Sequence, residues 1–122
     1  MPGRVTYPRC WLNTNLETVD NVAVIELLGE SLDAVASEEV KSQLCGLAAE
    51  HPRLVVDMSR ITFLDSSGCG TLVTAQKRCQ EAGGELLLCN ISDQVQTVLD
   101  ITRMTRVLAI YPTREKAVAA FA

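Results

Sequence analysis

Short apolar runs that alternate with segments of helical periodicity constrain the fold of this chain more than any other feature of its sequence. Four runs are almost continuously apolar, which is typical of strands buried on both faces of a sheet. They cover residues 22–28, 54–58, 85–90 and 107–111. All of them are too short to cross a bilayer, so we expect no direct membrane insertion.

Each run is followed by a segment in which apolar residues recur every three or four positions, the period of an amphipathic helix. These segments begin near Leu32, Ser66, Ser92 and Arg114. Side chains suited to capping the first three helices are Ser31 or Asp33, Asp65 or Ser66, and Ser92. The alternation predicts an α/β fold in which about four helices cover a mostly parallel mixed sheet of four to five strands.

Length, charge and cysteine content limit the classes of protein to which this chain can belong. With 122 residues there is room for one domain, residues 1–122, whose first 14 residues we expect to be loosely ordered or an edge strand. No apolar signal-peptide stretch follows Met1, so we expect a cytoplasmic protein. A net charge of -4 disfavours nucleic acid as a partner. Five cysteines without a Cys-x-x-Cys pair, and one histidine, predict neither a metal site nor a cofactor.

The segment from Asp65 to Gly70, DSSGCG, holds the side chains most suggestive of function. It lies where a predicted strand passes into a predicted helix, the edge at which α/β sheets usually place their sites. The free N–H groups at that helix start would stabilise an added anion. Gly68 and Gly70 would let another molecule approach the backbone closely. The alternative is that Asp65 or Ser66 is simply an N-cap, worth about 1 kcal/mol.

Catalytic interpretations of this segment lack the residues that they require. As a nucleophile, Ser66 or Ser67 would need a positioned base, and the only histidine, His51, adjoins Pro52 at a predicted helix end. The order is not Gly-x-Ser-x-Gly, and the Gly-Lys-Ser/Thr ending of a phosphate-binding loop is absent. We therefore expect a protein that is not an enzyme.

The stretch from Leu54 to Leu72, LVVDMSRITFLDSSGCGTL, resembles the signature of STAS domains, specifically of anti-sigma factor antagonists. In that family an apolar strand runs into Asp-Ser-Ser/Thr-Gly-Leu-Gly. The resemblance continues through residues 24–33, 83–88 and 95–99, and covers roughly residues 16–122. It implies the αβ sandwich of the STAS fold.

The resemblance also implies a switch that works by binding a protein. Ser66, in preference to Ser67, would be phosphorylated by a partner that is both a serine kinase and an anti-sigma factor. The unphosphorylated chain would sequester this partner and free a sigma factor, thereby regulating transcription, and a serine phosphatase would reset the switch. The expected partner-binding residues are Asp33, Asp65, Ser66, Ser67, Gly68, Cys69 and Gly70.

Two departures from the family pattern lie near this expected surface. Cys69 stands where the family usually has leucine, and Ser31 is an extra residue in the family's Gly-Glu-Leu-Asp turn. At a helix N-terminus Cys69 could have a lowered pKa and act as a redox thiol, or it could be a small apolar replacement for leucine. A further alternative is a non-switching STAS scaffold, such as a subunit of a membrane transport system, in which Ser66 serves only as a cap.

Overall fold

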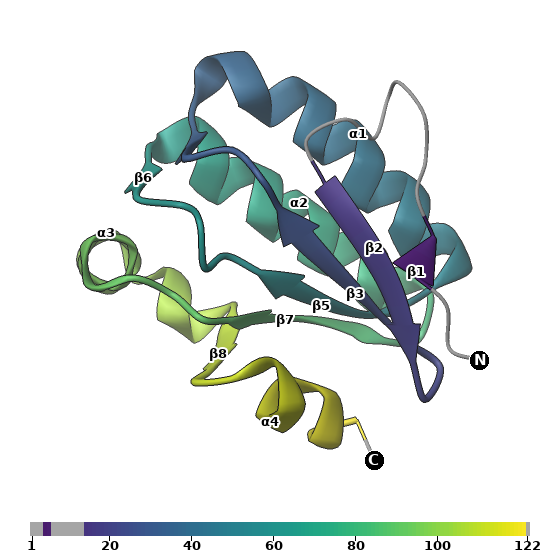
Figure 1. The fold of residues 1–122 in the computed structure, drawn as a ribbon. Coiled ribbons are helices and arrows are strands. Elements are labelled where there is room, and N and C mark those ends of the chain that lie inside the picture. The colour runs from purple at the N-terminus through teal and green to yellow at the C-terminus, as the bar shows by residue number, and fades with distance from the viewer. Residues whose placement is uncertain (1–3, 6–13, 122) are drawn as a thin grey trace.

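The computed structural model describes residues 4–5 and 14–121, which form a mixed β-sheet flanked by helices (Figure 1). The main sheet has the strand order β1-β2-β3-β5-β7-β8, and a separate two-stranded sheet pairs β4 with β6. The strands are β1 Arg4–Val5, β2 Thr14–Val19, β3 Val22–Leu27, β4 Ser31–Leu32, β5 Arg53–Asp57, β6 Phe63–Leu64, β7 Glu85–Cys89 and β8 Ala109–Tyr111. The helices are α1 Ala34–Glu50, α2 Ser66–Glu81, α3 Asp93–Ile101, the 3-10 helix η1 Met104–Arg106, and α4 Arg114–Ala119.

Strand pairing divides the main sheet into a parallel part and an antiparallel edge. The strands β3, β5, β7 and β8 pair in parallel, and they correspond to the four apolar runs of the sequence. The strands β1 and β2 add two antiparallel pairings beyond β3. The predicted α/β class, with a mixed sheet and four α-helices, is therefore confirmed. The two-residue β1 brings the sheet to six strands, one more than predicted.

The sequence analysis did not predict strand β2, which forms a hairpin with β3. The two strands meet at Asp20 and Asn21, whose φ angles of 50° and 67° are both positive. Positive φ at both central residues is the geometry of the turn that best matches the twist of a two-residue hairpin, and Asp and Asn tolerate it well. The Asp-Asn pair was the sequence signal for this hairpin. Of residues 1–14, only 4, 5 and 14 are described, and they lie in β1 and at the start of β2.

Two predicted element starts are wrong by two residues. The first helix begins at Ala34 and not at Leu32, because Ser31 and Leu32 pair with β6. Ser31 therefore lies in a strand and cannot cap α1. Strand β8 begins at Ala109 because the N–H groups of residues 107 and 108 donate to the Met104 carbonyl, at 3.0 and 2.8 Å, in a helical turn.

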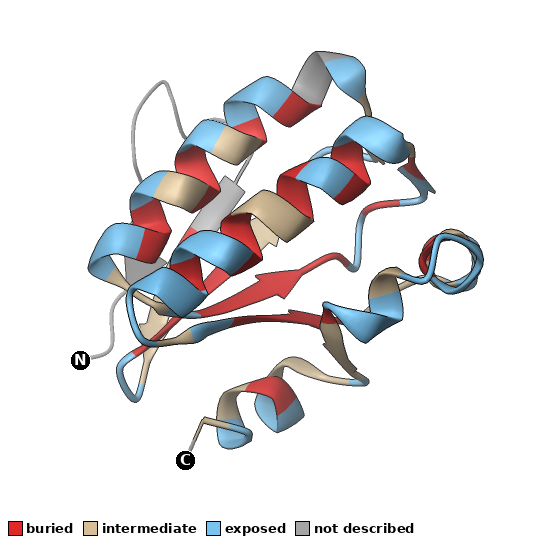
Figure 2. Ribbon diagram, turned by 180° about the vertical axis from the view of Figure 1, so that it is seen from behind, coloured by how far each residue is buried: buried red, intermediate tan, exposed pale blue. Residues whose placement is uncertain are grey.

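Helices cover the two faces of the sheet unequally. The buried sides of α1 and α2 face the sheet in Figure 2, and α3 joins them on the same side. This layer packs on alternate strand residues, among them Ile25, Val56 and Leu88. The opposite face carries α4, whose Ala117 packs with Val55 and the other outward-facing strand residues. The larger core is thus the one beneath α1, α2 and α3, and it holds α2 in place.

A buried glutamine fixes α2 along its length. The Gln76 side chain accepts a hydrogen bond from the Leu86 N–H of β7 at 2.7 Å and donates one to the Val107 carbonyl at 3.1 Å. Both ends of this buried amide are therefore satisfied, as a polar group in a core requires. The position of α2 against β7, and so of its first turn, is set by hydrogen bonds as well as by apolar packing.

Candidate functional site

The small β4–β6 sheet brings together the turns that precede α1 and α2. Ser31 is opposite Phe63 and Leu32 is opposite Leu64 in a parallel pair. The Asp65 N–H extends this pairing with a long hydrogen bond of 3.4 Å to the Leu32 carbonyl. Asp33 and Asp65, which follow the paired residues, therefore lie at adjacent helix starts. Sequence reasoning had placed both of them at the site.

Asp65 is the N-cap of α2, and Ser66 is the first residue of that helix. The Asp65 carboxylate accepts a hydrogen bond from the Gly68 N–H at 3.0 Å, with Asp65 itself in an extended conformation. Of the two caps that the sequence allowed, Asp65 is correct and Ser66 is wrong, because the β4–β6 pairing extends to Asp65 and keeps it outside the helix. The hydroxyls of Ser66 and Ser67 are exposed, and neither caps the helix.

Gly68 and Gly70 serve different purposes, although both are in the first two turns of α2. A Cβ atom added to Gly68 would lie within 2.3 Å of the Leu32 carbonyl oxygen and 2.5 Å of Leu64 Cδ1. Gly68 is buried, so the expectation that it opens the backbone to another molecule is wrong: its missing side chain makes room for β4 and β6. Gly70 is exposed, and a Cβ atom there would meet nothing within 4 Å.

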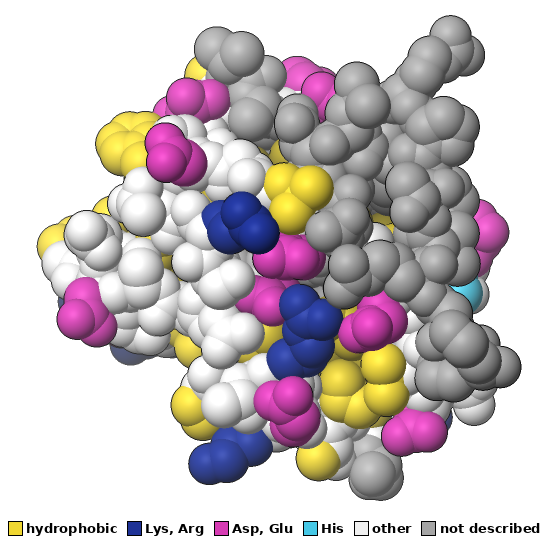
Figure 3. All heavy atoms as spheres, viewed as in Figure 1, with side chains coloured by type: hydrophobic (Ala, Val, Ile, Leu, Met, Phe, Trp, Pro, Cys, Tyr) yellow, Lys and Arg dark blue, Asp and Glu magenta, His cyan; other side chains and the backbone are white. Residues whose placement is uncertain are grey.

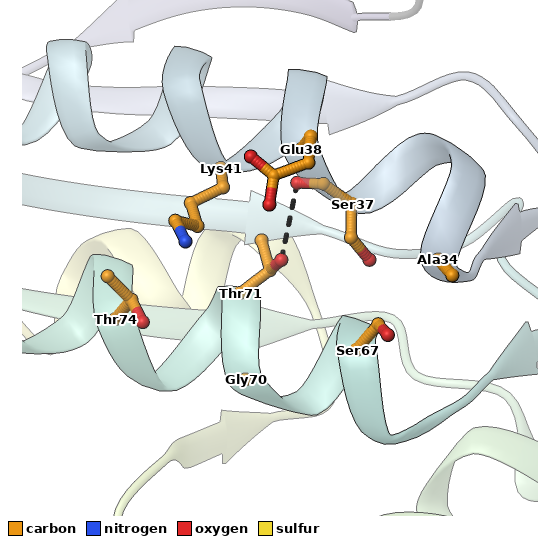
Figure 4. A pocket seen from close by; sticks show the side chains of 8 residues that line it. All are labelled: Ala34, Ser37, Glu38, Lys41, Ser67, Gly70, Thr71 and Thr74. Atoms are coloured by element: carbon orange, nitrogen blue, oxygen red, sulfur yellow. Dashed lines mark hydrogen bonds between the residues drawn. The ribbon is translucent and has the colours of Figure 1, made fainter.

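A groove of about 270 Å³ runs between α1 and α2 beside the serines (Figure 4). Ser67, Gly70 and Thr74 line it from α2, and Glu38 and Lys41 line it from α1. The helices are joined in the groove by the Thr71 hydroxyl, which donates to the Ser37 carbonyl at 3.3 Å. Ser66 is not among the lining residues, so the two adjacent serines face different surroundings.

Cys69 is a core residue, and its surroundings disfavour the reactive thiolate form. Only 6% of it is exposed, and it packs in the main hydrophobic core. Burial raises the pKa of the Cys69 thiol, and the nearby charge of Asp65 raises it further, which outweighs a hydrogen bond with Thr102. The hypothesis of a lowered pKa is therefore wrong. The alternative, a small apolar replacement for leucine, agrees with the packing.

The sequence analysis missed a charged cluster on the α4 face of the sheet. Asp57, at the end of β5, is 3% exposed and binds Arg114 through contacts of 2.5 and 3.2 Å. Arg114 also contacts Glu17 at 3.2 Å. Burial alone would raise the pKa of Asp57, but hydrogen bonds from Arg114 and Ser59 outweigh it and hold that pKa below its ordinary value. Figure 3 shows basic side chains beside acidic ones on this face.

The charged cluster holds the strand end from which the site loop departs. The Asp57 carboxylate also accepts a hydrogen bond from the Ser59 N–H at 3.0 Å, and Ser59 lies in the loop that leads to β6. Arg60, the next residue, contacts Glu26 of β3 at 3.1 Å. The signal in the sequence was an aspartate at the end of an otherwise apolar strand, but its arginine partner lies 57 residues away.

The part of the chain that the structure describes lacks two features, a cluster of metal-binding side chains and a membrane-spanning helix. No group of three or more His, Cys, Asp or Glu side chains there could hold a metal ion. Nor is any described helix both long and apolar enough to cross a membrane. What the site offers is exposed hydroxyl groups at a helix start and a polar groove next to them.

Comparisons with known proteins agree on the fold and find anti-sigma factor antagonists among the similar proteins. The STAS domain family matches residues 13–117. An anti-sigma F factor antagonist of Paenibacillus polymyxa is 28% identical over 110 residues, which cover 87% of this chain and 92% of that protein. The unphosphorylated form of the anti-sigma factor antagonist SpoIIAA has a similar structure, with a TM-score of 0.72, 24% identity, and coverage of 88% of this chain and 95% of that one.

Two further structures share the fold at lower identity. SpoIIAA of Bacillus in its phosphorylated form gives a TM-score of 0.64 at 23% identity, and the match covers 89% of this chain and 99% of that one. A sulfate transporter family protein of Wolinella succinogenes gives a TM-score of 0.72 at 22% identity, over 84% of this chain and 86% of that one. The fold is thus found both in sigma-factor regulators and in a transporter family.

Proposed function

This chain belongs to the STAS domain family, and we propose that it is an anti-sigma factor antagonist controlled by phosphorylation of Ser66. In its unphosphorylated form it binds and sequesters an anti-sigma factor that is a serine kinase. That capture frees a sigma factor and changes transcription in the cytoplasm. Phosphorylation of Ser66 by the captured kinase causes the complex to dissociate, and a serine phosphatase restores the unphosphorylated form that binds the kinase. The curated relatives that carry the name of this activity support the proposal.

The observation that carries the proposal is that Asp65, and not Ser66, caps α2. Asp65 caps α2, so the neighbouring exposed hydroxyl has no structural task in the helix. Among the residues that the structure describes, the hydrogen bond that caps α2 comes from Asp65, so a kinase can modify Ser66 without removing that bond. The new phosphate would sit at the positive end of α2, where the helix dipole stabilises it.

The phosphate acts on the partner and not on the fold. It adds about 1.5 to 2 negative charges beside the Asp65 carboxylate, on a surface that was previously occupied by a small neutral hydroxyl. Bulk and charge at that point repel a partner that fits the unmodified helix start. Binding and release, without any catalysis by this chain, complete the cycle that we propose. The exposed surface available for contact includes Ser66, Ser67 and Gly70, with the half-buried Asp33 and Asp65 at its side.

A non-switching scaffold in a membrane transport system is the alternative function. The structural similarity to a sulfate transporter family protein, at 22% identity, indicates the common fold alone. The scaffold needs no accessible hydroxyl at residue 66, whereas the switch requires one. We therefore favour the switch.

Phosphorylation and binding assays test the proposal directly. The chain is incubated with ATP and each purified serine kinase of the anti-sigma class encoded in the same genome, and the phosphate is located by peptide fragmentation. We expect phosphate on Ser66 in the wild type and in Ser67→Ala, and none in Ser66→Ala. Ser66→Ala should bind the kinase as the wild type does, and Ser66→Asp should bind at least about tenfold more weakly. Phosphate on Ser67, or full affinity in Ser66→Asp, would contradict the assignment.

A further inference from the structure

Gly70 lies inside α2, where glycine is the least favourable residue after proline. The usual structural reasons for a glycine do not apply at this position. A Cβ atom added to Gly70 would meet nothing within 4 Å, unlike one added to Gly68. The residue also has no positive φ angle, since among the described residues Gly83 is the one glycine with that geometry. The fold would accept alanine at this position.

What a side chain at Gly70 would change is the groove between α1 and α2. Gly70 lines this groove with Ser67 and Thr74 on the same helix, and with Ala34 across from them (Figure 4). All four are small, and together they keep open a volume of about 270 Å³ at the protein surface. A side chain at residue 70 would reduce that volume, and its Cβ atom would meet no neighbouring atom within 4 Å.

The walls of the groove present polar groups that are free to bind. The hydroxyls of Ser67 and Thr74, the Glu38 carboxylate and the Lys41 ammonium group form no hydrogen bond or ion pair with other described residues. One positive and one negative side chain leave the groove with no net charge. The free hydroxyls lie on the α2 side of the groove and the two opposite charges on its α1 side. An uncharged side chain that both donates and accepts hydrogen bonds can therefore bond to Glu38, to Lys41 and to a hydroxyl without being repelled by either charge.

We propose that the α1–α2 groove is a specificity pocket for the anti-sigma partner, and that Gly70 keeps it open to one uncharged, hydrogen-bonding side chain of that partner, such as Asn, Gln, Ser or Thr. This inference rests on the proposed function, because it names the second contact of the same docking surface. Ser66 lies outside the groove and is the position that the kinase modifies. Ser67, one residue further, faces the groove and contacts the inserted side chain.

Two glycine substitutions with matched surroundings test the proposal. Gly70→Ala and Gly46→Ala both add a methyl group to an open position in a helix, but Gly46 lies in α1 away from the groove. We expect each change to raise Tm by about 4 °C, because alanine favours the helix more than glycine does. Binding of the purified anti-sigma serine kinase should be unchanged in Gly46→Ala, weakened about tenfold in Gly70→Ala, and weakened about a hundredfold in Gly70→Leu.

The outcomes separate the groove from the proposed function. If the wild-type chain binds the kinase and Gly70→Leu binds it equally well, the groove is not part of the interface. In that case the inference about the groove is overturned, and the proposed function stands. If the wild type binds no serine kinase of this class, the proposed function fails, and the inference fails with it. Hydrogen exchange on the wild-type complex gives an independent readout: slower exchange over residues 34–41 and 67–74 supports the pocket, and unchanged exchange there overturns it.

Discussion

Replacement of Gly68 by alanine should destabilise the protein, although alanine is the better helix former. The added methyl carbon would lie 2.3 Å from the Leu32 carbonyl oxygen and 2.5 Å from Leu64 Cδ1, whereas ordinary contacts of such an atom are 3.4 to 4 Å. The first turn of α2 must therefore move by about 1 Å away from the β4–β6 sheet. Overpacking of this kind lowers the free energy of unfolding by about 3 kcal/mol at the upper end of its usual range. The higher helix propensity of alanine offsets about 1 kcal/mol of that loss.

The net loss of about 2 kcal/mol can be measured by urea unfolding followed by far-ultraviolet circular dichroism. With a slope of about 2 kcal/mol per molar urea, the unfolding midpoint should fall by about 1 M. Gly46→Ala is the matched control, since its methyl group meets nothing within 4 Å and its midpoint should rise. A Gly68→Ala protein with an unchanged or higher midpoint would refute the argument that Gly68 is required for packing and not for partner access.

Two further predictions concern titratable groups. The folded-state pKa of Asp57 lies below its unfolded value, so the contribution of Asp57 to stability is complete above the unfolded pKa of about 3.9 and is lost as pH falls through the lower folded pKa. Urea midpoints measured from pH 6 down to pH 2.5 should fall less in Asp57→Asn than in the wild type, and equal slopes would contradict the Arg114 contact. Cys69 has a raised pKa, so at pH 7.5 iodoacetamide should alkylate it more slowly in the native protein than in urea. Equal rates in the two conditions would show that the thiol is accessible and reactive.

The main strands could be predicted from the sequence because they are buried on both faces. Burial of both faces makes β3, β5 and β7 almost uniformly apolar, a pattern that needs no knowledge of neighbouring strands. The missed strands lack this signal. Strand β2 mixes polar and apolar residues at the antiparallel edge, and β4 and β6 are two residues long each, so only their mutual pairing defines them.

The composition of the site could be predicted, but the task of each residue could not. DSSGCG was located correctly at a helix start next to the strand ends. Which residue caps the helix depends on the β4–β6 pairing, and which glycine is buried depends on Leu32, which is distant in the sequence. The same holds for Asp57 at the end of β5 and Arg114 at the start of α4, which lie 57 residues apart in the sequence. Non-local contacts of this kind leave no periodic trace in a single sequence.

Within the first five positions of α2, the residues that pack in the core differ from the residues that are available to a partner. Gly68 and Cys69 are buried and fixed by packing, whereas Ser66, Ser67 and Gly70 are exposed and free of it. The exposed positions 66, 67 and 70 match the family pattern, so paralogous switches within one cell would have to be insulated from one another by groove residues outside that pattern, such as Glu38, Lys41 and Thr74. For the same reason, orthogonal pairs of switch and kinase could be engineered by varying residues 38, 41 and 74 together with the partner, at little cost in stability.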